Sequence, residues 1–156
     1  INPYGVSKWM SEMIISDMAK AHDLRATCLR YFNVAGADDK GRSGQSSPVA
    51  THLIKRATRV ALGKEASLSV FGQDYPTHDG SGVRDYIHVN DLIDAHLLAL
   101  DHLQDQDKVE IFNCGYGRGY SVFEVIAATE RVSGTALNVI TAERRNGDPA
   151  ELVASS

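Results

Sequence analysis

The sequence predicts an α/β protein with a mostly parallel sheet, and three observations favour this fold class. Segments with the apolar spacing of helices alternate with short apolar segments typical of buried strands. The chain of 156 residues is long enough to bury a core. Its composition, with 43% hydrophobic and 23% charged residues, is that of a globular protein. No repeat or linker interrupts it, so we expect one continuous unit over residues 1–156.

The first predicted element is a helix over residues 4–21, where apolar residues recur three or four positions apart. Asn2-Pro3 in front of it suits a first helical turn. The short apolar segment 26–32 predicts a buried strand. The stretch 34–47 is rich in Gly, Asp and Ser and predicts a long loop.

Helical spacing returns over residues 48–62 and ends at Gly63. A strand is expected at 68–71, and a second long loop at 72–83. Asn90 or Asp91 is a suitable cap for a helix that runs through His102.

The last third of the chain repeats this alternation. Residues 109–113 predict a strand, and Ser121 with Glu124 forms a capping box for a helix that runs to Gly134. A final strand is expected at 137–140. The order of elements therefore indicates strand–helix units with some irregular additions.

Composition excludes several classes of protein. The chain has 16 Lys and Arg against 20 Asp and Glu, which argues against a nucleic-acid-binding protein. No stretch reaches the roughly 18 apolar residues that a membrane-spanning helix needs. Cys28 and Cys114 match neither a disulfide framework nor a zinc spacing, which favours a reducing cytoplasm.

Tyr4 and Lys8 form the first candidate site. Residues four positions apart share one face of a helix. A lysine ammonium within about 6 Å favours the phenolate form of a tyrosine, which can then take a proton from a sugar hydroxyl. The alternative is that Tyr and Lys share a helix face by chance.

Two arginine-containing segments are candidate anion sites. Arg84 follows a Gly-rich loop, and a guanidinium can donate two hydrogen bonds to phosphate oxygens. Arg144 and Arg145 precede a turn that reaches Asp148, whose carboxylate can accept from sugar hydroxyls. The alternatives are a surface pair of Arg84 with Asp85 and a solvated turn.

A third basic feature is the segment 40–64, which has no acidic residue. Positive charge of this kind in a net-negative chain can attract a phosphorylated substrate. The alternative is a solvated helix face. The basic residues are Lys40, Arg42, Lys55, Arg56, Arg59 and Lys64.

The segment Gly115-Tyr-Gly-Arg-Gly119 lies between a strand and a helix but is not a dinucleotide-binding fingerprint. That fingerprint needs a glycine where this chain has Tyr120, so we expect a tight strand-to-helix turn. The six histidines form neither an HExxH motif nor a cluster, so we expect no metal site.

Four motifs follow one another along the chain. They are Asn2-Pro-Tyr-Gly-x-Ser-Lys8, Leu29-Arg-Tyr-Phe-Asn33, the long run from Val70 to Val89, and Arg144-Arg-x-Gly-Asp148. In this order they resemble the UDP-glucose 4-epimerases of the extended short-chain dehydrogenase/reductases, and the resemblance covers the whole chain. It implies the later part of a Rossmann-type parallel sheet with a smaller α/β domain that binds a UDP-sugar.

The resemblance also implies roles for individual residues. Tyr4 would be the acid and base on the sugar 4-hydroxyl, and Lys8 would assist it and hold the nicotinamide ribose of NAD. Phe32 would contact NAD. The UDP-sugar would be bound by Asn33, His52, Leu53, Ser69, Val70, Phe71, Arg84, Arg145 and Asp148.

Within this set the resemblance implies a division of labour. The segment 69–71 would line the uracil, Arg84 and Arg145 would clamp the diphosphate, and Asp148 would take the ribose hydroxyls. The family often has Asn-Asn-Leu where this chain has Thr51-His52-Leu53.

The activity that the resemblance implies is NAD-dependent epimerisation at C4 of a UDP-hexose. It would interconvert UDP-glucose and UDP-galactose through a 4-keto sugar, in a cytoplasmic homodimer that serves galactose metabolism. A 4-epimerase of a UDP-pentose or a UDP-N-acetylhexosamine is an alternative. A non-catalytic UDP-sugar-binding domain is another. A 4,6-dehydratase is disfavoured by the residues around the Tyr-Lys motif.

The two ends of the sequence predict an internal segment of a longer protein. The chain is already within a motif at Ile1, and it ends at Ser156 without a charged or Gly-rich tail. By the resemblance, the Gly-rich NAD-binding turn and an active-site Ser or Thr would lie upstream. We therefore expect the 156 residues alone to be inactive and to expose a sheet edge.

Overall fold

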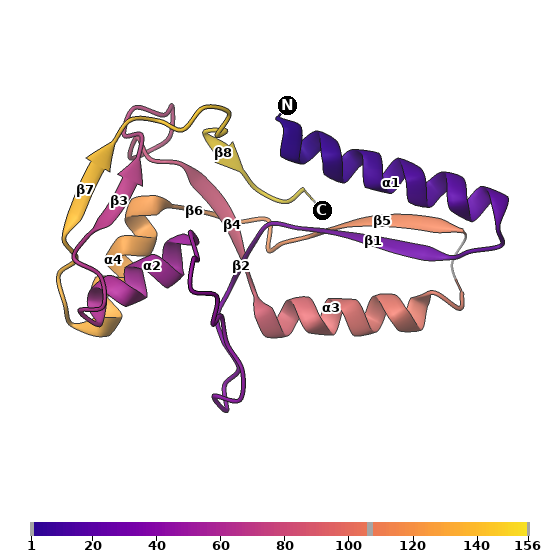
Figure 1. The fold of residues 1–156 in the computed structure, drawn as a ribbon, viewed down its shortest axis with the longest axis horizontal. Coiled ribbons are helices and arrows are strands. Elements are labelled where there is room, and N and C mark those ends of the chain that lie inside the picture. The colour runs from indigo at the N-terminus through magenta and orange to yellow at the C-terminus, as the bar shows by residue number, and fades with distance from the viewer. Residues whose placement is uncertain (1, 106–107, 156) are drawn as a thin grey trace.

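The computed structural model describes residues 2–105 and 108–155, which form an α/β fold (Figure 1). In one half of the molecule, a parallel strand pair lies between two helices, one on each side. These elements are α1 (Pro3–Ala21), β1 (Ala26–Tyr31), α3 (Val89–His102) and β5 (Val109–Cys114).

The other half has two helices that pack together beside a second parallel strand pair (Figure 1). Its buried core is formed by residues of α2, β3 and α4 and by Leu137 just before β7, and the partly buried Val139 of β7 packs against it. Each fully buried aliphatic side chain of this kind stabilises the fold by about 1.5–3 kcal/mol. The elements are α2 (Leu53–Ala61), β3 (Leu68–Phe71), α4 (Val122–Ser133) and β7 (Val139–Ala142). The core residues are Ala57, Val60, Leu68, Val70, Ile126 and Leu137.

A third sheet joins the two halves, and β4 (Val83–His88) is its central strand. It pairs in parallel with β2 (Asn33–Ala35) and β8 (Glu151–Leu152), and antiparallel with β6 (Gly119–Ser121). Four of the five pairings among the described strands are parallel, which confirms the predicted fold class. These strands form three separate sheets rather than one continuous sheet.

Helices α1 and α4 confirm the predicted boundaries. Asn2 caps α1 by accepting a hydrogen bond from the backbone of its first turn. Ser121 and Glu124 form the predicted capping box of α4, and Gly134 ends this helix with φ 66°.

Two helix starts differ from the prediction. Helix α2 begins five residues late, because the chain from Pro48 to His52 is not helical and His52 has extended backbone (φ −66°, ψ 133°). Helix α3 is capped by His88 rather than by Asn90 or Asp91. The His88 ring accepts from the backbone N–H of Asn90 at 3.2 Å, because β4 leads directly into the helix.

The sequence does not predict the strands of the third sheet. All four have six residues or fewer, so their pattern is too short to recognise. Strand β6 also corrects the predicted turn, because the segment 115–119 leads into this short strand before α4 begins. The last predicted strand, 137–140, lies two residues further along the chain as β7.

Candidate active site

A cavity of about 510 Å³ lies where α2, β3 and β4 meet. Its volume is typical of a site for a small molecule. All nine residues expected to bind a UDP-sugar line it, although they come from five separate segments. They are Asn33, His52, Leu53, Ser69, Val70, Phe71, Arg84, Arg145 and Asp148.

Two strand pairings bring the turn at 143–150 to this cavity. The β3–β7 pairing places the start of the turn beside Phe71, and the β4–β8 pairing places its end beside Arg84. The turn is therefore held at both ends by sheets. Because it carries Arg145 and Asp148, these residues meet parts of the chain that lie far away in sequence.

The two adjacent arginines of this turn have different partners. Arg144 Nε donates to Asp74 Oδ1 at 2.6 Å, and this hydrogen bond lowers the pKa of Asp74. The Arg144 guanidinium also lies 4.2 Å from the centre of the Tyr75 ring. The Arg145 guanidinium lies 3.9 Å from the centre of the Phe71 ring, in the wall of the cavity. The turn is exposed, as the alternative of a solvated turn expects, but Arg144 and Arg145 have the partners named above and Arg145 also lines the cavity.

Arg84 and Asp85 have opposite surroundings on β4. Arg84 lines the cavity, and its Nη1 donates to a backbone carbonyl at 2.7 Å. The Asp85 carboxylate is fully buried and accepts from the backbone N–H groups of Tyr116 (3.1 Å), Gly117 (2.9 Å) and Ala154 (3.2 Å). The alternative of an exposed Arg84–Asp85 pair is wrong.

The segment 115–119 uses its backbone to hold Asp85. A dinucleotide-binding turn offers its backbone N–H groups to a phosphate, but here those of Tyr116 and Gly117 donate to the Asp85 carboxylate. A Cβ on Gly115 would lie 2.6 Å from Asp85 Oδ2, so the turn needs glycine there. Its role is structural, as the sequence predicts.

The sequence does not single out seven further residues of the cavity wall. Arg56 is the one with a full charge. The basic segment 40–64 contains it, and its position three residues after Leu53 on a helix would have been the signal. Burial raises the pKa of another, Tyr86. The seven are Thr51, Arg56, Leu68, Tyr75, Gly82, Tyr86 and Val122.

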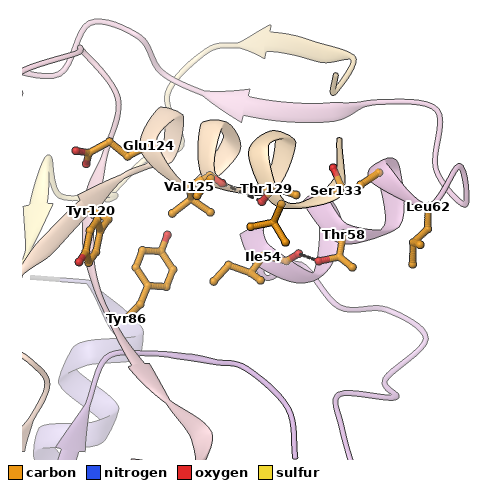
Figure 2. Close-up of a pocket in the computed structure, with 12 residues that line it drawn as sticks. Ile54, Thr58, Leu62, Tyr86, Tyr120, Glu124, Val125, Thr129 and Ser133 are labelled. Atoms are coloured by element: carbon orange, nitrogen blue, oxygen red, sulfur yellow. Dashed lines mark hydrogen bonds between the residues drawn. The ribbon is translucent and has the colours of Figure 1, made fainter. Parts of the chain in front are cut away.

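A second cavity, of about 470 Å³, lies between α2 and α4 and is mostly apolar. Figure 2 shows Tyr86 and Tyr120 at one end of it, and Val125 of α4 across from Ile54 of α2. Its threonine hydroxyls donate within their own helices, as Thr129 does to a backbone carbonyl at 2.9 Å. Tyr86 lines both cavities.

Tyr4 and Lys8 lie on the first turns of α1, outside the wall of the 510 Å³ cavity. Lys8 Nζ is 5.3 Å from the centre of the Tyr4 ring, and Tyr4 is 73% exposed. The start of α1 is close to the turn of the cavity, since a Cβ on Gly147 would lie 3.8 Å from Asn2 Cβ. Phe32 is half-buried between β1 and β2.

Among residues 2–105 and 108–155, no three His, Cys, Asp or Glu residues are grouped so as to hold a metal ion. None of the described helices has the length and apolar character needed to cross a membrane.

A tyrosine and a lysine one helical turn apart, beside parallel strands, are features of the extended short-chain dehydrogenase/reductase class, to which this fold conforms. The model of the NAD dependent epimerase/dehydratase family matches residues 1–115, so the chain belongs to this family.

The chain is similar over nearly its whole length to several UDP-glucose 4-epimerases. UDP-glucose 4-epimerase of Azospirillum brasilense is 56% identical over 156 residues, which are 100% of this chain and 45% of that protein. The structure of UDP-glucose 4-epimerase from Brucella ovis with NAD has 44% identity and a TM-score of 0.92, over 99% of this chain and 48% of that one. The Bifidobacterium longum enzyme with NAD+ and UDP has 41% identity and a TM-score of 0.91, over 99% and 47%. The chain spans about half the length of the curated relatives it matches.

Proposed function

We propose that the protein to which this chain belongs is an NAD-dependent 4-epimerase of UDP-hexoses that interconverts UDP-glucose and UDP-galactose, a reaction of galactose metabolism. The single observation that carries the proposal is that one cavity collects arginines, a carboxylate and an aromatic ring from five distant segments. Its relatives, which are UDP-glucose 4-epimerases, support the choice of substrate.

The cavity has the groups that a UDP moiety needs. Arg84 and Arg145 are the donors for the diphosphate, where arginine forms paired hydrogen bonds. Asp148 accepts from the ribose hydroxyls, and the β3 segment 69–71 lies against the uracil. Asn33 contacts the sugar, and His52 with Leu53 lies at the phosphate side. These contacts hold the nucleotide while the sugar is free to turn.

The Tyr4–Lys8 pair fits the reacting end of an NAD site, because the phenol is exposed and the ammonium lies over its ring at 5.3 Å. When bound, NAD supplies a hydride acceptor and donor for C4 of the sugar. Tyr4 takes the O4 proton as C4 is oxidised to the ketone, and it returns that proton to O4 as C4 is reduced from its opposite face. Lys8 favours the phenolate and holds the nicotinamide ribose, and Phe32 contacts the cofactor. We assign the remaining NAD contacts to the part of the protein outside this chain.

We further propose a cytoplasmic homodimer. The free thiols of Cys28 and Cys114 suit a reducing compartment. Helix α1 exposes Trp9, Met13 and Ile14, which is the kind of face that a second subunit covers.

The test uses the whole protein as wild type and as two tyrosine-to-phenylalanine variants. Conversion of UDP-galactose to UDP-glucose is followed for wild type, Tyr4→Phe and Tyr31→Phe. Tyr31 is also exposed but lies at the end of β1 outside the cavity wall, so it is the matched control. We expect Tyr4→Phe to lose at least about 100-fold in turnover and Tyr31→Phe to retain it.

Other outcomes separate the alternatives. If a UDP-pentose or a UDP-N-acetylhexosamine is turned over in a Tyr4-dependent way and UDP-galactose is not, the proposed substrate is wrong and the proposed mechanism stands. Binding of UDP-sugars without turnover of any would point to the non-catalytic binding domain.

A further inference from the structure

The basic segment 40–64 places one of its six cations in the wall of the cavity, and that cation is Arg56. The others have other surroundings. Arg42 pairs with Asp38, Lys55 donates to the backbone carbonyl of Gln45, and Lys40 and Lys64 are exposed. Arg56 is therefore the member of the segment whose surroundings are those of a ligand site.

A shared carboxylate holds Arg56 and Arg59 in place. Arg56 Nε lies 2.5 Å from Glu65 Oε2, and Arg59 Nε lies 2.5 Å from Glu65 Oε1. Two guanidinium groups on one carboxylate leave one net positive charge. Glu65 therefore orients Arg56 without neutralising this corner of the cavity.

The outer nitrogens of Arg56 have no acceptor among the described residues. Its ion pair with Glu65 is formed by Nε, which lies close to Glu65 Oε2 without hydrogen-bond geometry, and no hydrogen bond joins Nη1 or Nη2 to another described residue. A guanidinium has five N–H donors in one plane, so four remain for a ligand. The side chain is 38% exposed, so these donors are accessible.

The charge of the cavity indicates what these donors would bind. Its wall has three arginines, Arg56, Arg84 and Arg145, against one carboxylate, Asp148. We propose that Arg56 is a third anion-binding residue, which donates to the diphosphate of the nucleotide sugar from the α2 side of the cavity. This inference rests on the proposed function and adds a residue that the resemblance does not assign.

Arg59 offers a matched control for the test. It lies three residues along the same helix, pairs with the same Glu65 carboxylate and is 39% exposed, but it is not in the cavity wall. Arg56→Gln and Arg59→Gln therefore each remove one of the two pairs to Glu65. Only the first changes the cavity.

The experiment is calorimetric titration of the whole protein with UDP and with uridine, for wild type and both variants. We expect Arg56→Gln to raise the Kd of UDP roughly ten- to a hundredfold and to leave the uridine Kd within about twofold. Arg59→Gln should leave both within about twofold, while the two variants lower Tm by similar amounts. For turnover of UDP-galactose, Arg56→Gln should raise KM and leave kcat unchanged.

Two results would overturn the inference. If both variants raised the Kd of UDP equally, or if neither raised it, Arg56 would only support α2 through Glu65. Failure of wild type to bind UDP at all would remove the proposed function together with this inference, whereas a normal wild type with a neutral Arg56→Gln would remove the inference alone.

Discussion

Asp85 helps to fix the geometry of the cavity. Its buried carboxylate binds backbone N–H groups of the 115–119 turn and of Ala154, just after β8. Arg84, the neighbour of Asp85 on β4, is therefore fixed relative to the end of the turn that carries Arg145. A buried carboxylate is costly unless its oxygens accept hydrogen bonds, and here both do.

Asp85→Asn should destabilise the protein by about 2–4 kcal/mol. The amide nitrogen of asparagine cannot accept, so at least one buried backbone N–H loses its partner and faces another donor. Urea unfolding of the whole protein measures this change. Asp94→Asn, at an exposed position of α3, is the control and should lie within about 0.5 kcal/mol of wild type. A loss at Asp85 no larger than at Asp94 would contradict this account of the buried carboxylate.

At the residue scale, sequence motifs predicted Arg84 and Arg145 as cavity residues. They did not distinguish Arg56, which lies in no motif. Arg84 and Arg145 lie in recognisable runs, and both line the cavity. Arg56 lies among five other cations, and only the phase of α2 and the position of Glu65 distinguish it from Arg59. The Arg84–Asp85 alternative failed because sequence adjacency does not reveal that the two side chains have opposite surroundings.

At the scale of elements, one ion pair links α1 to β1. Arg30 of β1 donates to both carboxylate oxygens of Glu12, at 2.7 and 2.6 Å. Ala19 is the one fully buried residue of the described helix. Tyr4 and Lys8 are on the same helix as Glu12. The Glu12–Arg30 ion pair therefore also helps to position Tyr4, the proposed base.

The Glu12–Arg30 pair predicts an acid-sensitive attachment of α1. The hydrogen bond from Arg30 lowers the pKa of Glu12 below its ordinary value. A carboxyl whose folded pKa is lowered contributes stability above its unfolded pKa of about 4.3, and this is lost as pH falls through the folded pKa. Glu12→Gln should cost about 0.5–1 kcal/mol at pH 7, and the difference from wild type should shrink as pH falls through the lowered folded pKa of Glu12.

The measurement is the free energy of unfolding of wild type and Glu12→Gln between about pH 3 and pH 7. Glu143→Gln is the control, because Glu143 is exposed and has no hydrogen bond or ion pair among the described residues. A constant difference at all pH values would show that charge on Glu12 does not stabilise the helix.

Elements with local signals were predictable, and those defined by partners were not. The capping box and Gly134 define α4 within the sequence itself, and both ends were predicted. Strand β8 has two residues and exists because β4 pairs with it, so no local pattern indicates it. Helix α2 also starts later than its local pattern predicts. His52 lies in the cavity wall with extended backbone and does not continue the helix.

At the scale of the whole molecule, the chain exposes more surface than its mass accounts for. Its accessible surface is 10514 Å², whereas a compact monomer of 17.0 kDa exposes about 7,700 Å². Many of the exposed large apolar side chains belong to α1, α3, β1 and β5, the half in which the strand pair lies between two helices (Figure 1). Among them, Trp9 is 58% and Leu98 70% exposed. Each strand of the β1–β5 pair also has an edge without a described partner.

This surface predicts that the 156-residue polypeptide, expressed by itself, associates and binds ANS. Contiguous exposed apolar side chains and open strand edges favour contact with other chains. Light scattering after size exclusion should give a mass that rises with concentration, together with strong ANS fluorescence. The whole protein should give one discrete species with little ANS fluorescence, because the part outside this chain and the proposed second subunit would together cover the β1–β5 half. A monomer without ANS binding and with a sharp thermal transition would instead mean that the α2–α4 core supports the fold alone.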